Sequence, residues 1–277
     1  MQKVYSEPIK QDLIGKRIKE IKKAKAVCAA SVTPANTKKF APICAEAGID
    51  IFVVQSTVTT ARHISKSYKG LSFSDLYKVM PAPIIVGNCV SYKATLELMQ
   101  QGVSGILVGV GPGAACTTRE VTGVGVPQIT ATLDCATARE QHLKDTGKYV
   151  VLITDGGFRT SGDICKAIAA GADAVMLGSI FAQTNEAPGR GYHWGMATPH
   201  ASLPRGTRVR VGTTTSLKQI LFGPSSVTSG TQNLVTALKT SMGMCGARNI
   251  REMQKATMVI APSIKTEGKH WQQCQTQ

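Results

Sequence analysis

The sequence has no long hydrophobic run, no paired cysteine motif and few acidic or aromatic residues. No window contains the roughly 18 to 20 consecutive apolar residues that a membrane-spanning helix needs, so we expect no membrane span. The first residues, MQKVYSEPIKQD, are polar and unlike a secretory signal, which predicts a cytoplasmic protein. The eight cysteines include no C-x-x-C pair, which argues against a zinc site. We expect most of them to be reduced and buried.

The shortage of acidic residues leaves a strongly basic chain. It has 32 Lys and Arg against 17 Asp and Glu, a formal net charge of +15. The densest basic run, residues 16–25, belongs to a segment where Ile14, Ile18 and Ile21 have helical spacing, so we expect a solvated helix face there. Aromatic residues that could stack on bases make up only 5% of the chain. We therefore interpret the charge as a preference for small anions. Nucleic-acid binding, which would depend steeply on salt, is the weaker alternative.

A repeated unit is visible along the chain: a short β-branched run, a polar turn and then a helical stretch. This alternation predicts an α/β fold with a parallel sheet and right-handed crossovers. The runs are apolar on both faces, as in strands covered by helices. Six strands are predicted, at residues 26–31, 50–57, 83–89, 105–111, 149–157 and 173–179.

The alternation stops after residue 179. We expect one domain over residues 1–277, with residues 185–233 as an irregular, flap-like excursion, followed by a helix at residues 233–244. A (β/α)₈ barrel has eight strands, so either the sheet is open or two units precede these six. In both architectures the polar turns after the strands form the site.

Two of these turns have features of a phosphate site. The segment TDGGFRTSGDI contains Asp155, Gly156 and Gly157, and LGS follows one strand later with Gly178 and Ser179. Adjacent glycines let backbone N–H groups approach a phosphate, and Asp155 could accept bonds from ribose hydroxyls. Ser161 or Asp163 is expected to cap the next helix. The alternative is that D-G-G is a plain turn.

A third turn, GVGPGAACTTR at residues 109–119, matches neither the dinucleotide fingerprint nor a P-loop. Its glycines bracket a proline, so we expect a shaped loop. Backbone N–H groups and Arg119 would favour the thiolate of Cys116. The alternative is a structural cysteine. Thr117 and Thr118 could cap a helix or orient a water molecule.

These motifs together resemble the IMP dehydrogenase/GMP reductase family. The resemblance rests on GVGPGAACTTR, GVGVPQ, DGGFRTSGDICKAIAAGADAVMLGS, EAPG, GM and MGMCGARNIREM, in the family's order and spacing. YHWGMATP and LPRGTRVRVGTT are similar to a bacterial IMP dehydrogenase-related subfamily of actinobacteria and cyanobacteria. The family fold is a TIM (β/α)₈ barrel. The six visible βα units resemble its third to eighth, and the first two strands are expected to be missing from this chain.

The resemblance implies an oxidoreductase of purine metabolism. Cys116 would form a covalent thioimidate at carbon 2 of the purine, and NAD or NADP would exchange a hydride with that carbon. IMP would become XMP, or GMP would become IMP. The implied roles are water or ammonia activation for Thr118; nucleotide binding for Asp155, Gly156, Gly157, Gly178, Ser179, Met196 and Ala197; nicotinamide-cofactor binding for Gln55 and Asn88; and a monovalent-cation site, potassium for example, on the backbone carbonyls of Gly111, Gly113 and Cys116. The family also implies a homo-oligomer, commonly a tetramer.

The sequence departs from the family at several positions. Ala114 occupies the position of a phosphate-binding serine in the family. Likewise, Gln55 occupies the position of an aspartate, and His193 that of a tyrosine. The Arg-Tyr pair of the dehydrogenase flap does not occur after GMAT, and the reductase's glutamate is not evident, with Arg205 near its place. The missing Arg-Tyr pair favours the GMP reductase direction. IMP dehydrogenase and a non-catalytic nucleotide-binding fragment are the alternatives.

Overall fold

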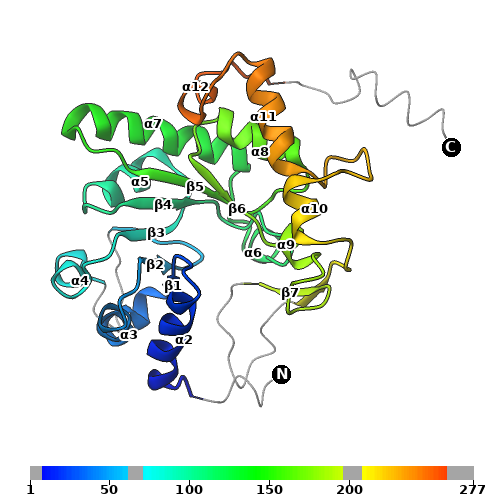
Figure 1. The fold of residues 1–277 in the computed structure, drawn as a ribbon. Coiled ribbons are helices and arrows are strands. Elements are labelled where there is room, and N and C mark those ends of the chain that lie inside the picture. Colours follow the sequence, from blue (N-terminus) through cyan, green and yellow to red (C-terminus); the bar gives the residue numbers. More distant parts are fainter. Residues whose placement is uncertain (1–7, 62–70, 196–207, 261–277) are drawn as a thin grey trace.

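The core of the molecule is a curled, six-stranded parallel sheet. The structure, a computed structural model, describes residues 8–61, 71–195 and 208–260. The strands lie in chain order as a half-barrel (Figure 1), and each pairs in parallel with the next. They are β1 (Ala29–Val32), β2 (Ile51–Gln55), β3 (Ile84–Cys89), β4 (Gly105–Val108), β5 (Val151–Asp155) and β6 (Ala174–Met176). The six predicted strands and the α/β, barrel-type fold class are confirmed.

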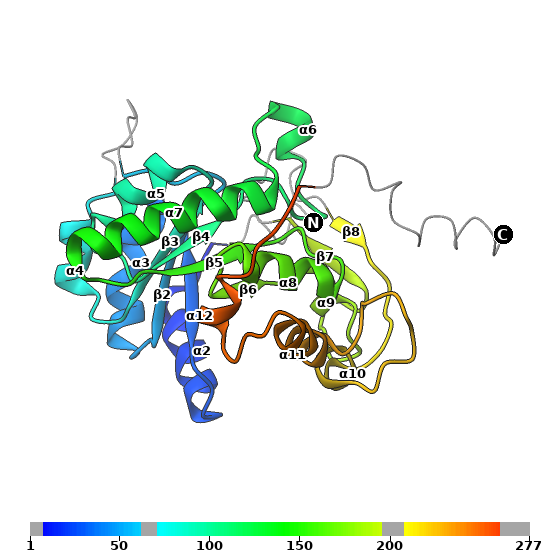
Figure 2. The same cartoon turned by 90° about the horizontal axis from the view of Figure 1, so that it is seen from above.

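Helices lie along the outer side of the sheet (Figure 2), where α3 packs on β1 and β2, α5 on β3 and β4, and α7 on β4 and β5. The helices are α2 (Gln11–Lys23), α3 (Pro34–Glu46), α4 (Phe73–Val79), α5 (Tyr92–Met99), α6 (Thr118–Thr122), α7 (Gln128–Thr146), α8 (Ser161–Ala169), α9 (Ser179–Ala182), α10 (Leu217–Phe222), α11 (Leu234–Met244) and α12 (Ile250–Met253). None of the helices within the described ranges is long and apolar enough to cross a membrane.

Burial differs between the central and outer strands. All four residues of β4 are buried, as are five of the six in β3. In β2, Phe52 and Val54 pack in the core while Ile51 and Val53 are only partly buried. At the sheet edges, β1 and β6 contain no fully buried residue. The expectation that all strands are covered on both faces is therefore wrong for the outer ones, because the described strands do not close a barrel.

The helix starts refine two predictions. Residue Thr160 caps α8, and it forms a reciprocal capping box with Asp163, so the cap is one residue earlier than Ser161. Helix α2 forms as predicted, with Ile18 buried, but Ile21 is 41% exposed.

The excursion at 185–233 contains regular elements that we did not predict. Strand β7 (Tyr192–Trp194) pairs antiparallel with β8 (Arg208–Arg210), and α10 follows.

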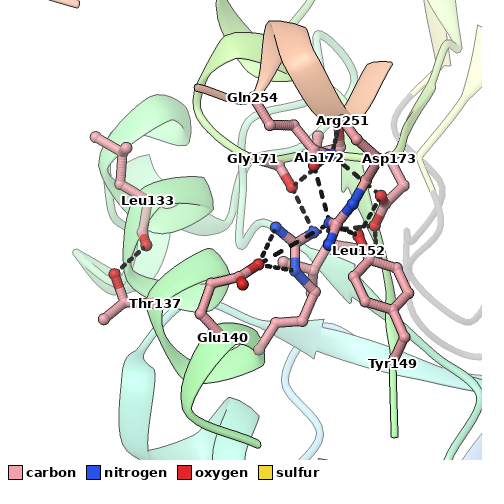
Figure 3. Close-up of polar contacts among 11 residues, drawn as sticks. Leu133, Thr137, Glu140, Tyr149, Leu152, Gly171, Ala172, Asp173, Arg251 and Gln254 are labelled. Carbon is pink, nitrogen blue, oxygen red and sulfur yellow. Dashed lines mark hydrogen bonds and ion pairs between the residues drawn. The ribbon is translucent and has the colours of Figure 1, made fainter. Parts of the chain in front are cut away.

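A polar cluster joins the C-terminal helix α12 to α7 and to the edge of the sheet (Figure 3). Asp173 is its centre. One carboxylate oxygen accepts from Arg139 at 3.1 Å and from the N–H of Leu152 at 2.8 Å. The other accepts from the Tyr149 hydroxyl and the Gln254 amide. The Arg139 side chain is only 3% exposed, so this is a buried ion pair.

Candidate active site

Three predicted site residues meet at the carboxyl end of the sheet. Asn88 donates from Nδ2 to Oδ2 of Asp155 at 2.8 Å, and Gln55 donates from Nε2 to the same oxygen at 3.1 Å. The Gln55 amide also donates to Oδ1 of Asn88 at 3.0 Å. Because these residues end or nearly end β2, β3 and β5, the sheet itself brings them together.

The carboxylate of Asp155 has an unusual electrostatic setting. Burial raises its pKa above the ordinary aspartate value, and the hydrogen bonds from Asn88 and Gln55 oppose that rise. Both bonds end on Oδ2, so Oδ1 has no donor among the described residues. That oxygen is available to accept a hydrogen bond from a ligand hydroxyl.

Cys116 lies in the loop between β4 and α6, two residues before Thr118, the first residue of that helix. Its side chain is exposed, whereas Cys28, Cys44, Cys89 and Cys135 are buried, as predicted for most of the cysteines. The thiol donates to the hydroxyl of Thr118 at 3.2 Å. The N–H of Cys116 donates to the carbonyl of Gly113 at 3.0 Å, which closes a tight turn before the cysteine.

The guanidinium of Arg119 has a different role from the one we expected. It donates from Nε to the carbonyl of Val110 at 3.0 Å and from Nη2 to the carbonyl of Val126 at 2.6 Å. A side chain added at Gly111 or Gly125 would lie about 2.6–2.7 Å from Arg119 atoms. The arginine therefore holds the two limbs of the loop together, and its hydrogen bonds go to backbone carbonyls.

Two neighbouring segments approach this loop. At Gly157 a Cβ would lie 3.1 Å from the Cβ of Pro112, so the turn after β5 lies against the cysteine loop. At Gly195 a Cβ would lie 2.9 Å from the carbonyl oxygen of Ala115, so the chain after β7 also reaches it. The cysteine loop is thus in contact with the turn that follows Asp155.

The predicted phosphate turns are only partly arranged as expected. Gly156 and Gly157 both have positive φ, +79° and +85°, but the N–H of Gly156 donates to the carbonyl of Met176 at 3.1 Å. Gly178 precedes α9, and open space lies where its Cβ would be. The hydroxyl of Ser179 pairs with Nε2 of His193 at 2.9 Å. A side chain from the excursion therefore reaches the predicted phosphate site.

Other predicted groups remain predictions. Met196 and Ala197 lie outside the described residues. Of the proposed cation ligands, the Gly113 carbonyl already accepts the Cys116 N–H, which leaves it a second lone pair. The described parts of the chain contain no group of three or more His, Cys, Asp or Glu that could hold a metal.

Sequence reasoning missed Gln128, the first residue of α7. Its amide donates from Nε2 to the carbonyls of Val108 at 2.8 Å and Asp155 at 3.0 Å. The available signal was its place in GVGVPQ, directly after the cysteine loop and at the start of a helix.

A parallel α/β half-barrel that gathers a carboxylate, two amides and an exposed thiol at the carboxyl ends of its strands defines an enzyme of the α/β-barrel class. Comparison with known proteins makes this more specific. A family profile described as "IMP dehydrogenase / GMP reductase domain" matches residues 9–269. The chain therefore belongs to the IMP dehydrogenase/GMP reductase family and is an oxidoreductase of that family.

The individual relatives agree with this assignment. An uncharacterized oxidoreductase of Mycobacterium leprae is 38% identical over 94% of this chain and 71% of its own length. The IMP dehydrogenase of Methanocaldococcus jannaschii is 34% identical over 89% of this chain and 53% of its own length. A crystal structure of an IMP dehydrogenase/GMP reductase-like protein from Corynebacterium glutamicum superposes with a TM-score of 0.86, at 35% identity, over 94% of this chain and 68% of that one.

Proposed function

We propose that this chain is a nicotinamide-dependent oxidoreductase that acts at carbon 2 of a purine mononucleotide through a covalent bond to Cys116. The observation that carries the proposal is the contact between two loops. Gly157, two residues after Asp155, lies against Pro112 in the loop that presents the exposed thiol. This contact supports the proposal that one bound molecule would meet both the carboxylate and the sulfur. The resemblance to enzymes named IMP dehydrogenase supports the same substrate class.

The nucleotide would be held at two points. Oδ1 of Asp155, which has no donor among the described residues, would accept from a ribose hydroxyl. Ser179 and His193 would donate to the phosphate, with the backbone around Gly178 beside them. The net charge of +15 favours a dianionic phosphate. Because Gly157 has no side chain, the phosphate could approach its backbone closely. The N–H of Gly156, by contrast, already donates to the carbonyl of Met176.

Cys116 would act as the nucleophile. As the sulfur adds to carbon 2, the double bond between carbon 2 and N3 would open, and N3 would take up the thiol proton, which the Thr118 hydroxyl could relay. With GMP, the 2-amino group takes up a proton and departs as ammonia, leaving a thioimidate on Cys116. Hydride addition at carbon 2 then breaks the carbon–sulfur bond and gives IMP and the free thiol. With IMP, a hydride leaves carbon 2 to give the same thioimidate, and water displaces the sulfur to give XMP. Thr118 would orient the ammonia or the water.

The donors at the site fit a nicotinamide cofactor. The primary amides of Gln55 and Asn88 can each donate and accept, which is the chemistry that pairs with a carboxamide or a ribose hydroxyl. Such a cofactor, when bound, accepts or donates the hydride. Gln55 and Asn88 would bind and orient it, and their bonds to Asp155 would couple its position to that of the nucleotide. A potassium ion on the carbonyls of Gly111, Gly113 and Cys116 is a further part of the proposal.

We propose the GMP reductase direction. Between Gly195 and Val211 the sequence contains no tyrosine, so it lacks the Arg-Tyr pair that prepares water in the dehydrogenase. Without that pair, release of the adduct by hydride addition is favoured over hydrolysis. IMP dehydrogenase is the alternative direction, and the names of several relatives favour it.

The test is to incubate the full-length protein with GMP and NADPH, and separately with IMP and NAD, and to follow the absorbance of reduced nicotinamide. Oxidation of NADPH that depends on GMP supports the proposed direction. Reduction of NAD with IMP alone overturns the direction and retains the chemistry. Nucleotide binding without turnover in any combination, in both wild type and Cys116→Ser, identifies a non-catalytic nucleotide-binding protein.

A further inference from the structure

One side-chain amide connects the two strands that carry the proposed chemistry. Gln128 donates from Nε2 to the carbonyl of Val108 at 2.8 Å and to the carbonyl of Asp155 at 3.0 Å. Val108 is the last residue of β4, directly before the cysteine loop, and Asp155 is the last residue of β5. The amide thus fixes the root of the Cys116 loop to the residue that presents the carboxylate.

The orientation of this amide is determined by its surroundings. Both neighbours are carbonyl oxygens, so only the NH₂ end of Gln128 can face them. The opposite atom, Oε1, is buried and has no hydrogen-bond partner among the described residues. An unsatisfied buried acceptor is rare in folded proteins and costs stability. The two hydrogen bonds of the Gln128 amide are therefore made at a cost in stability.

The first glycine of the GVGPGAACTTR motif makes room for this amide. Gly109 has φ +135°, and a Cβ there would lie 2.5 Å from Nε2 of Gln128 and 2.8 Å from the carbonyl of Asp155. Any side chain at this position would displace the amide, because the neighbouring backbone cannot yield. Gly109 and Gln128 are therefore a matched pair, although 19 positions separate them in the sequence.

We infer that Gln128 is a positioning residue, which holds the Cys116 loop against the end of β5 so that the thiol and the Asp155 carboxylate address one nucleotide. The inference rests on the proposed function and extends it to a residue that touches neither substrate nor cofactor. A displacement of about 1 Å between reacting groups costs roughly 100-fold in rate. Loss of the amide should therefore lower kcat far more than it changes the nucleotide KM.

The first test is Gln128→Met, which keeps the length of the side chain and removes both hydrogen bonds. Its control is Gln141→Met on the same helix, where the amide donates to Asp145 one turn away at 2.8 Å. We expect Gln128→Met to reduce kcat by roughly 100-fold with little change in KM, and Gln141→Met to behave as wild type. A wild-type kcat for Gln128→Met overturns the inference.

A second measurement does not need turnover. Alkylation by iodoacetamide, followed by mass spectrometry, gives the labelling rate of Cys116 relative to Cys245, which is also exposed and serves as the internal standard. Gln128→Met should change this ratio several-fold, because the loop is no longer fixed at Val108. An unchanged labelling ratio in a folded variant contradicts the inference, whether or not the wild-type protein turns over a nucleotide. Absence of turnover in the wild-type protein would count against the proposed function instead.

Gln128→Glu provides a third measurement, and it decides the question if Gln128→Met does not fold. A protonated carboxyl group can donate one of the two hydrogen bonds, whereas a carboxylate can donate none and faces two carbonyl oxygens. The ratio of variant to wild-type kcat should therefore rise as the pH is lowered. A merely structural side chain would not create a new pH dependence. A ratio that is independent of pH overturns the inference.

Discussion

The side chains of Asn88 and Asp155 form a hydrogen bond of 2.8 Å that joins the ends of β3 and β5. Gln55, at the end of β2, donates to the same carboxylate oxygen. Three strands thus converge on one carboxylate, whose second oxygen has no donor among the described residues. We therefore expect a substitution at Asp155 to affect the binding of both the proposed nucleotide and the proposed cofactor.

Asp155→Asn should weaken nucleotide binding while leaving the fold intact. The substitution replaces a charged acceptor with a neutral amide, and a hydrogen bond to a charged group contributes about 1.5–3 kcal/mol. This corresponds to a roughly 10- to 150-fold increase in Kd for GMP or IMP, measured by titration calorimetry. An unchanged Kd would show that the carboxylate does not hold the ribose.

Nucleotide affinity should fall at acidic pH because the acceptor must be ionised. Burial raises the pKa of Asp155, so the loss should occur above the ordinary aspartate value of about 3.9. Since the folded state binds this proton more tightly than the unfolded state, the same shift destabilises the free protein as the pH rises through that range. Binding and stability should therefore respond to pH in opposite directions.

Gln55→Met should shift the loss of nucleotide affinity at acidic pH to a higher pH. The substitution removes one donor to the ionised carboxylate, and that hydrogen bond lowers the pKa of Asp155. Ser31→Ala is the control, because the Ser31 hydroxyl contacts Gln55 at 3.4 Å and does not touch Asp155. If Gln55→Met loses nucleotide affinity at the same pH as wild type, the hydrogen bond from Gln55 does not set the pKa of Asp155.

Bound nucleotide should affect the alkylation of Cys116 but not that of the other exposed cysteine, Cys245. Cys116 and Cys245 are both exposed, whereas four of the other described cysteines are buried. We expect bound GMP or IMP to protect Cys116 from iodoacetamide and to leave the labelling of Cys245 unchanged, as read by peptide mass spectrometry. Equal labelling of Cys116 with and without nucleotide would place the nucleotide elsewhere.

The ion pair between Arg139 and Asp173 should matter for stability, not chemistry. Arg139→Met leaves the carboxylate of Asp173 partly buried without its cation, and breaking a buried pair costs about 3–5 kcal/mol in the free energy of unfolding. Lys16→Gln breaks a pair whose side chains are both 66% exposed and should cost less than about 1 kcal/mol. Urea denaturation measures both, and similar midpoints for the two variants would contradict this assignment.

The sequence predicted the strands well because the alternation of apolar runs and helical stretches is a strong periodic signal. The carboxyl ends of parallel strands share one edge of the sheet, and there the structure brings Asp155 and Asn88 into contact; their roles remain predictions. The sequence could not show that Arg119 would bond to the carbonyls of Val110 and Val126, because those contacts depend on how the loop returns to β4. Nor could it show that the N–H of Gly156 donates to the carbonyl of Met176, because that bond joins the turn after β5 to the end of β6.

The central claim is that Cys116 bonds covalently to carbon 2 of a purine nucleotide. The most direct measurement is the intact mass of the protein after acid quenching during turnover with GMP and NADPH, or with IMP and NAD. We predict a fraction of protein heavier by one nucleotide adduct, located on Cys116 by peptide mapping and absent from Cys116→Ser. Turnover at the wild-type rate by Cys116→Ser, or an adduct on another residue, would contradict the account.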